Sequence, residues 1–421
     1  MSVSEEQGSS RPPRLERTTL SELIQLRRDL HRYPELRFTE QRTARTLAGR
    51  LTSAGFSVRT GFAGTAVLGT IDSGRPGPHV LLRTDMDALP TADLTAKPYA
   101  SQHAGVSHAC GHDVHCAVAV GAASAVTAGG LARGRLSVLC QPAEEIPFGE
   151  ASGAQSVLDS GVLQELGDIA AVLGLHSWPQ LPAGAIGVDP VTAMAAKLAF
   201  RISVTGHGAH AATPHLGRDA LLAASQLTLT LHTLIGRRTG SSEQAALNVG
   251  TFRAGTSQSI VPRSAEVTGT IRSIDDDVAT RLRDAVDKAA DGVGMTFGVD
   301  AEVEWKNQMP AVRNDCRLVE LALRELPSAR HVDAVVPLAS APMTTDDFAL
   351  YAARWPALYL KLGVATPGAP SWPSLHDGRF DVDESCIAAG AGALAGLTTA
   401  ILDGGLDNAG SGNSRRPARH Q

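Results

Sequence analysis

The stretch covering residues 116–145, CAVAVGAASAVTAGGLARGRLSVLCQPAEE, decides the fold class of this chain. Its first part, residues 116–128, is rich in alanine and predicts a helix that stops at Gly129-Gly130. The apolar run at residues 136–140 predicts a buried strand that ends at Gln141-Pro142. A helix, a glycine turn and a buried strand in this order are typical of an α/β protein with a largely parallel sheet.

Helix and strand signals alternate on both sides of this stretch. Apolar residues at helical spacing predict helices over residues 19–30, with Thr19 or Ser21 as the cap, over residues 40–54 and over residues 387–402. Short apolar or β-branched runs predict strands at residues 65–71, 79–83 and 170–175. In sheets of this kind, functional side chains usually follow the carboxyl ends of the strands.

The pattern changes near residue 192, which predicts an inserted domain. Its expected elements are a strand (197–204), a helix (218–234), two strands (245–252, 265–271), a helix (276–293) and a strand (300–305). This β-α-β-β-α-β order is the ferredoxin-like pattern. We therefore predict an α+β insert at 192–307 within a discontinuous domain of residues 17–191 and 308–406. The polar ends, residues 1–16 and 407–421, are predicted to be disordered tails.

Composition excludes several classes of protein. The 421 residues include 38 Lys and Arg against 43 Asp and Glu, a net charge of −5, which argues against nucleic acid or an anionic membrane as partner. Five scattered cysteines without an N-terminal apolar segment argue against a disulfide framework. The run at residues 387–402 is shorter than the ~20 residues that span a bilayer. We expect a globular, cytoplasmic protein.

The densest group of candidate ligands is His108-Ala-Cys-Gly-His-Asp-Val-His115. Cys110 and His112 offer a thiolate and an imidazole, which bind divalent transition metals, and the glycine between them permits a tight turn. Asp113 is a candidate cap for the following helix. The alternative is a reduced core cysteine beside a helix-capping turn.

Two adjacent carboxylates, Glu144 and Glu145, follow the strand at residues 136–140. Neighbouring residues on an extended chain point in opposite directions. One carboxylate can therefore bind a metal while the other acts as a general base, as metal-assisted hydrolysis requires. The alternative is a solvated pair on the surface.

Other polar residues also occupy predicted strand ends or loops. His176 follows an apolar strand, and His376 precedes the last helix. Together with Cys110, His112 and a glutamate, these residue types could hold a pair of metal ions. Asp85 or Asp87 could bind a metal or orient an imidazole N–H, or could form a turn closed by Pro90.

The insert carries further candidates. The glycine-rich segment at residues 206–215 contains His210 and His215, which could stabilise an oxyanion or lie in a surface loop. Arg272 could pair with a substrate carboxylate, or equally form a structural salt bridge.

With these motifs in place, the chain resembles the M20 family of metallo-amidohydrolases, in the subgroup of hippurate hydrolase, N-acyl-amino-acid amidohydrolases and plant auxin-conjugate hydrolases. The segments that carry the resemblance are residues 83–90, 108–113, 141–145, 174–176, 206–215, 269–272 and 375–376. They occur in the family's order across nearly the whole chain.

The resemblance implies a zinc-peptidase-like catalytic domain with a mixed, largely parallel sheet and an inserted lid through which the chain forms a homodimer or a higher homo-oligomer. It implies two divalent ions per subunit (Zn, Mn, Co or Ni), with the ligands Cys110, His112, Glu145, His176 and His376, and with Cys110 as a bridge. Glu144 would be the general base and acid. His210 would polarise the scissile carbonyl in its own or a partner's site.

We group Asp87 with Glu144 and His210 as predicted catalytic residues, and Arg272, His215 and Ser259 as predicted substrate-binding residues. The chain departs from the usual family pattern at Val114, at Ser259, and in the segments 146–153 and 345–348. The lid serine and these two segments line or flank the cleft in the family, so they bear on the substrate.

The function implied is hydrolysis of the amide bond of N-acyl-amino acids or related small conjugates by a metal-activated water. Three alternatives stay open at this point. The chain could be a dipeptidase or carboxypeptidase-like enzyme, or a catalytically silent metal-binding homologue. It could also be a cysteine hydrolase with Cys110 and His112 as nucleophile and base.

Overall fold

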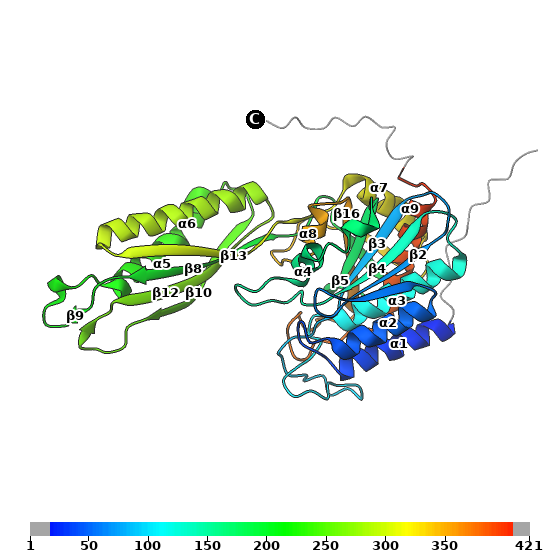
Figure 1. Ribbon diagram of the computed structural model, residues 1–421, viewed down its shortest axis with the longest axis horizontal. Coiled ribbons are helices and arrows are strands. Elements are labelled where there is room, and N and C mark those ends of the chain that lie inside the picture. Colours follow the sequence, from blue (N-terminus) through cyan, green and yellow to red (C-terminus); the bar gives the residue numbers. More distant parts are fainter. Residues whose placement is uncertain (1–16, 407–421) are drawn as a thin grey trace, which may run out of the picture.

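The computed structural model describes residues 17–406, and the predicted disordered tails lie outside the described residues. The chain forms two parts, a large α/β domain and an elongated insert that projects from it (Figure 1). Within residues 17–406, no helix combines the length and the apolar character needed to cross a bilayer.

The large domain is built on one mixed sheet, which confirms the predicted fold class. Its strands, in spatial order, are β1 (Ser57–Phe62), β2 (Ala66–Asp72), β4 (Arg135–Gln141), β3 (His79–Asp85), β5 (Ala171–Pro182), β16 (Ala357–Ala365), β6 (Ala185–Val188) and β15 (Ala334–Pro337). The central strands β4, β3, β5 and β16 run parallel to one another. Their carboxyl ends therefore meet at one edge of the sheet.

Helices cover both faces of this sheet. Within β3, Val80 and Leu82 join the core on one face and Leu81 joins the core on the other, which explains the continuous apolar run in the sequence. Helices of the first face are α1 (Arg17–Arg32), α2 (Gln41–Ser53), α3 (His112–Gly129), α7 (Cys316–Glu325) and α9 (Cys386–Leu402), and those of the second are α4 (Gly153–Asp159) and α8 (Ala349–Ala352). Short 3₁₀ turns lie at η1 (Gln164–Leu166) and η3 (Leu326–Ser328).

The insert has its own four-stranded antiparallel sheet. The strand order is β10 (Ala245–Ala254), β12 (Ser264–Ser273), β8 (Ala196–Thr205) and β13 (Asp300–Met309). Two helices, α5 (Ala220–Arg238) and α6 (Asp276–Phe297), share a separate apolar core with this sheet. A two-stranded ribbon of β9 (Ala209–His210) and β11 (Ile260–Val261), with η2 (Pro214–Leu216), lies at the end away from the large sheet (Figure 1). The order of elements is that expected for the ferredoxin-like pattern.

The chain enters and leaves the insert through two paired segments. β7 (Thr192–Met194) and β14 (Val312–Arg313) form a short antiparallel ribbon between the two parts. Because the crossings are neighbours, both ends of the insert are fixed at one place on the large domain.

Three local predictions were wrong. α1 already begins at Arg17, so Thr19 and Ser21 lie inside the helix and do not cap it. α3 begins at His112 rather than near residue 116, and its N-cap is Gly111, so Asp113 lies in the first turn and pairs with Arg27 at 2.8 Å instead of capping. β5 continues to Pro182, which places His176 within the strand and not at its end.

Candidate metal centre

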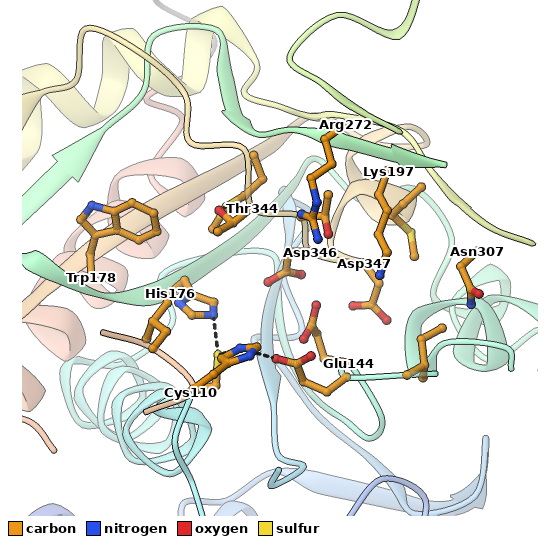
Figure 2. Close-up of a pocket in the computed structure, with 17 residues that line it drawn as sticks. Cys110, Glu144, His176, Trp178, Lys197, Arg272, Asn307, Thr344, Asp346 and Asp347 are labelled. Carbon is orange, nitrogen blue, oxygen red and sulfur yellow. Dashed lines mark hydrogen bonds and ion pairs between the residues drawn. The ribbon is translucent and has the colours of Figure 1, made fainter. Parts of the chain in front are cut away.

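Four of the five candidate ligands, Cys110, Glu145, His176 and His376, line a cavity at the carboxyl edge of the large sheet, under the insert. The loop after β3 brings Asp87, the start of α3 brings Cys110 and His112, and the loop after β4 brings Glu144 and Glu145. His176 comes from β5 (Figure 2), and His376 comes from the loop before α9.

Cys110 lies at the centre of the candidate ligands. Its Sγ is 3.4 Å from Nε2 of His176 and 3.4 Å from Nε2 of His376. Ligand atoms of Cys110, His112 and His176 lie within 4.8 Å of one another, and so do those of Cys110, Glu145 and His376. Cys110 is the residue that these two groups share.

The electrostatics of this group favour a thiolate. Burial opposes ionisation of Cys110, but the charge of His176 and the contacts with the imidazoles of His112, His176 and His376 outweigh it and lower the thiol pKa to about 6. Burial also opposes a charge on His176, yet the neighbouring Cys110 raises the pKa of that imidazole to about 9. Hydrogen bonds to Cys110 and Glu145 raise the pKa of His376 to about 10. The thiolate is the form of cysteine that binds metals.

Backbone geometry at two positions serves this arrangement. Gly111 has φ +85°, and a Cβ at this position would lie 2.5 Å from Oγ of Ser177, so the close packing of α3 against β5 requires glycine. His376 has φ +69°, a conformation that costs energy for a residue with a side chain. Gly111 lies between the candidate ligands Cys110 and His112, and His376 is itself a candidate ligand, so both conformations help to position the same group of ligands.

Asp87 fixes the loop that carries the two glutamates. Its Oδ1 accepts the backbone N–H of Glu144 at 3.1 Å, and its Oδ2 accepts that of Glu145 at 3.0 Å. Nδ1 of His112 lies 2.8 Å from the Asp87 carbonyl oxygen, which directs the other ring nitrogen of His112 toward Cys110 and His176. Asp87 therefore orients neighbouring groups, one of the roles predicted for it, and does not line the cavity.

The surroundings of Glu144 and Glu145 shift the pKa values of these two adjacent residues in opposite directions. Burial raises the pKa of Glu144 well above its usual range, and the charges of Asp346 and Glu145 add to this effect. Burial would also raise the pKa of Glu145, but Oε1 of this residue lies 2.8 Å from Nε2 of His376, and that contact lowers it. Glu145 is thus held as a carboxylate among the ligands, while Glu144 is half-buried beside them and able to carry a proton.

A buried ion-pair network, which the sequence analysis did not identify, lies behind Glu144. Arg83 contacts Asp85 at 2.6 Å and Asp347 at 2.7 Å, and Asp346 lies 3.4 Å from the same guanidinium. Asp346 and Asp347 also line the cavity, and Figure 2 shows Asp346 above Glu144. Asp346 and Asp347 fall in the segment 345–348 already noted as unusual, but their pairing with Arg83, 264 residues away from Asp347, has no local signal.

The insert closes the upper side of the cavity. Arg272, Lys197 and Asn307 come from three of its strands and point toward the acidic residues (Figure 2). Arg272 forms no salt bridge within residues 17–406, and its Nη1 donates to the Met343 carbonyl at 2.8 Å. Asn307 accepts the Gly149 N–H at 2.8 Å and donates to the Glu150 carbonyl at 2.8 Å, which ties β13 to the loop after β4.

His210, His215 and Ser259 do not line this cavity within one chain. All three are exposed in or beside β9, η2 and β11, at the end of the insert away from the large sheet (Figure 1). β8 starts at the connecting ribbon and runs away from the large domain. The residues that follow β8 therefore lie at the far end of the insert, away from the cavity. The roles predicted for these three residues remain predictions.

The donor set fits divalent transition metals. Nε2 of His112 is buried and has no hydrogen-bond partner in the described part of the chain, although it faces the other ligands. A buried nitrogen without a partner is costly, and a metal ion would satisfy it. Ligands about 2.0–2.3 Å from one tetrahedral ion lie roughly 3.5 Å apart, close to the separation of Cys110 from each imidazole.

Comparisons with known proteins agree with this geometry. Residues 81–400 match the model of peptidase family M20/M25/M40. The chain is 33% identical to N-acetyl-L-cysteine deacetylase of Bacillus subtilis strain 168, over 92% of this chain and 89% of that protein. It is 31% identical to thermostable carboxypeptidase 1 of Saccharolobus solfataricus, over 89% of this chain and 93% of that one.

A solved structure is also similar throughout. A Bacillus subtilis protein described as a dinuclear metal-binding peptidase of the M20 family superposes with a TM-score of 0.78. The two chains are 29% identical, and the superposition covers 92% of this chain and 99% of the other.

Proposed function

The chain belongs to peptidase family M20/M25/M40, and from this premise we propose that it is a metal-dependent hydrolase that cleaves the amide bond of N-acyl-amino acids. The observation that carries the proposal is the position of Cys110, shared by two groups of ligands, with the carboxylate of Glu144 beside them and free of the ligand set. Metal-assisted hydrolysis needs both a metal site and a separate base.

We propose that Cys110, His112, Glu145, His176 and His376 would hold two divalent ions, and Cys110 belongs to both groups of candidate ligands. When bound, such ions supply Lewis acidity, which makes water a nucleophile near neutral pH and polarises a carbonyl. Zn, Mn, Co and Ni all suit mixed thiolate, imidazole and carboxylate ligands, so metal supply in the cell decides among them.

Glu144 performs the proton transfers in this proposal. Its carboxylate accepts a proton from the attacking water and returns it to the departing amine nitrogen. Burial raises the pKa of Glu144 above that of an exposed glutamate, and a higher pKa makes its carboxylate a stronger proton acceptor. Asp87 keeps the Glu144 backbone in place, and Arg272 binds the carboxylate of the substrate.

A carboxypeptidase-like or dipeptidase activity is the second candidate. The similarity to thermostable carboxypeptidase 1 supports it, because a C-terminal amino acid in a peptide presents the same α-carboxylate and amide as an N-acyl-amino acid. A silent homologue is disfavoured, since the base and all five proposed ligands are present and adjacent.

We further propose that the protein is a homodimer that assembles through the insert. β10 is an edge strand of the insert's sheet, and α5 exposes Leu222 and Leu229, with 53% and 65% of their surface accessible. These leucines are seven residues apart and share one face of the helix. His210 lies near the same exposed end and would enter a partner's cavity rather than its own. The cytoplasmic location remains a prediction, which the five free thiols support.

The experiment that tests the function uses protein stripped of metal and reloaded with Zn, Mn, Co or Ni. A panel of acetylated and benzoylated amino acids and dipeptides is incubated with each form, and the released amines are identified by mass spectrometry. Release from N-acyl-amino acids by the reloaded protein supports the proposal, and release from dipeptides alone favours the second candidate. Hydrolysis that persists without metal and stops on thiol alkylation would point to a cysteine hydrolase instead.

A further inference from the structure

Two cationic side chains of the insert enter the cavity side by side. Lys197 of β8 and Arg272 of β12 are directly opposite each other in the antiparallel ladder and both line the cavity (Figure 2). The Cβ atoms of directly opposite residues are about 4.5–5.5 Å apart, and like charges at such positions are destabilising. An anion bound beside Lys197 and Arg272 would offset this repulsion.

The described chain does not supply this anion. Within residues 17–406, neither Lys197 nor Arg272 forms an ion pair, and the hydrogen bond of Arg272 is to the uncharged Met343 carbonyl. Burial lowers the pKa of both groups, as expected for cations that lack a close partner. The carboxylates that act on Lys197 are Glu144 and Glu145, and both are already assigned to the catalytic machinery.

One substrate carboxylate does not satisfy both cations. The planar guanidinium of Arg272 matches a single carboxylate in a bidentate pair, which is the expected contact for the α-carboxylate of an N-acyl-amino acid. The ammonium of Lys197 is a separate point charge on the neighbouring strand, on the side of Arg272 away from Trp178 (Figure 2). Lys197 therefore offers a cation distinct from Arg272 to a second acidic group of a bound substrate.

We propose that Lys197 determines specificity by binding a second acidic group, so that the preferred substrates are N-acyl derivatives of amino acids with two carboxylates. This inference rests on the proposed function and narrows it. Hydrogen bonds to charged groups contribute more than neutral ones, enough to give about a tenfold to hundredfold preference.

Matched substrates test the proposal. N-acetyl-aspartate differs from N-acetyl-asparagine, and N-acetyl-glutamate from N-acetyl-glutamine, only in an acid replaced by an amide of nearly equal shape. The metal-loaded wild-type protein should hydrolyse each acid with kcat/KM about ten- to a hundredfold above that of its amide. Lys197→Met should reduce this ratio to below about threefold, mainly through KM, and change kcat/KM for the amides by less than about threefold.

Two further variants serve as controls, one for loss of a lysine elsewhere and one for misfolding of Lys197→Met. Lys288→Met removes an exposed lysine from α6 and should leave the ratio as in wild type. Lys197→Gln retains a polar side chain and should lose the preference as Lys197→Met does, which guards against a misfolded methionine variant. A wild-type ratio near one, or an equal loss of acid and amide hydrolysis in both Lys197 variants, would overturn the proposal.

A binding measurement separates this inference from the proposed function. Calorimetry on metal-loaded Glu144→Gln protein, whose turnover should be strongly reduced, should show N-acetyl-aspartate binding about tenfold more tightly than N-acetyl-asparagine. Introducing Lys197→Met as a second substitution should abolish the difference. If the wild type hydrolyses no N-acyl-amino acid of the whole panel, the proposed function fails, whereas hydrolysis of other N-acyl-amino acids but of none of these four compounds would overturn the specificity proposal alone. Equal binding of the acid and the amide by Glu144→Gln protein would refute the role of Lys197 alone.

Discussion

The Oδ1 atom of Asp87 accepts the backbone N–H of Glu144 at 3.1 Å, so a buried carboxylate outside the cavity holds the main chain of the proposed base. Asparagine at position 87 would keep the size of the side chain but place an NH₂ group against one of the two N–H donors of the glutamate loop. We expect Asp87→Asn to reduce kcat about ten- to a hundredfold, as is typical for residues that orient ligands. KM should change little, and steady-state kinetics of the metal-loaded variant provide the check.

Replacing the base itself should separate metal binding from turnover. Glu144→Gln removes the proton acceptor but leaves the five proposed ligands intact, so the metal content should equal that of wild type. The rate of amine release should fall by about a factor of 10²–10⁴. Metal analysis of the same preparation that is assayed makes the comparison direct, and near-normal turnover would rule out the role of Glu144.

Removal of a ligand should have the opposite outcome. His376→Ala deletes an imidazole 3.4 Å from Cys110 Sγ and 2.8 Å from Glu145, so the variant should bind less metal after dialysis and lose activity in proportion. His232→Ala, which changes an exposed histidine on α5, serves as the control. Full metal content in His376→Ala would remove this histidine from the ligand set.

The buried network behind the base should be important for stability. Arg83→Met would leave Asp85 and Asp347 without their buried cation, and breaking a buried pair in this way costs about 3–5 kcal/mol. Denaturant unfolding should show this loss in the free energy of unfolding. Arg379→Met removes an exposed cation that, within residues 17–406, pairs only with Asp377, and it should cost much less than Arg83→Met. Similar losses in the two variants would contradict the importance assigned to Arg83.

One histidine far from the cavity should make folding sensitive to acid. Burial lowers the pKa of His79 to about 4, whereas the unfolded chain has the ordinary value near 6.5. Between these values the unfolded state binds the extra proton, so the stabilisation is present above pH 6.5 and is lost as the pH falls toward 4. From pH 7 to pH 5, His79 should account for about 2 kcal/mol of lost stability.

His79→Gln provides the measurement for this prediction. The free energy of unfolding of the glutamine variant should fall less between pH 7 and pH 5 than that of wild type, because glutamine does not titrate. Other histidines contribute equally to both proteins and cancel in the difference. An identical pH dependence in the two proteins would show that His79 is protonated in the folded state as readily as in the unfolded one.

Local sequence patterns predicted the helices and strands along the chain better than the spatial order of the strands in the large sheet. The alternation of apolar runs gave the α/β layer and the order of elements in the insert, since each element carries its own periodicity. The sequence did not indicate that β16 lies between β5 and β6, because strand order depends on packing between segments almost 200 residues apart.

The same distinction applies to the cavity. Cys110, His112, Glu145, His176 and His376 were identifiable because their residue types suit one chemistry, and the structure brings them together. Lys197 was not identifiable, because a half-exposed strand does not reveal which of its faces lies over another domain. His210 shows the reverse case, in which a motif suggestive of catalysis lies on a ribbon outside the cavity of its own chain.

The position of β16 has a consequence for how the protein is made on the ribosome. The strand that completes the centre of the sheet, between β5 and β6, is translated more than 160 residues after both of them, and His376 follows it. In a nascent chain, the place between β5 and β6 therefore stays empty until β16 has been synthesised. Metal loading should accordingly be a late step of biogenesis that follows the synthesis of His376 and the entry of β16 into the sheet.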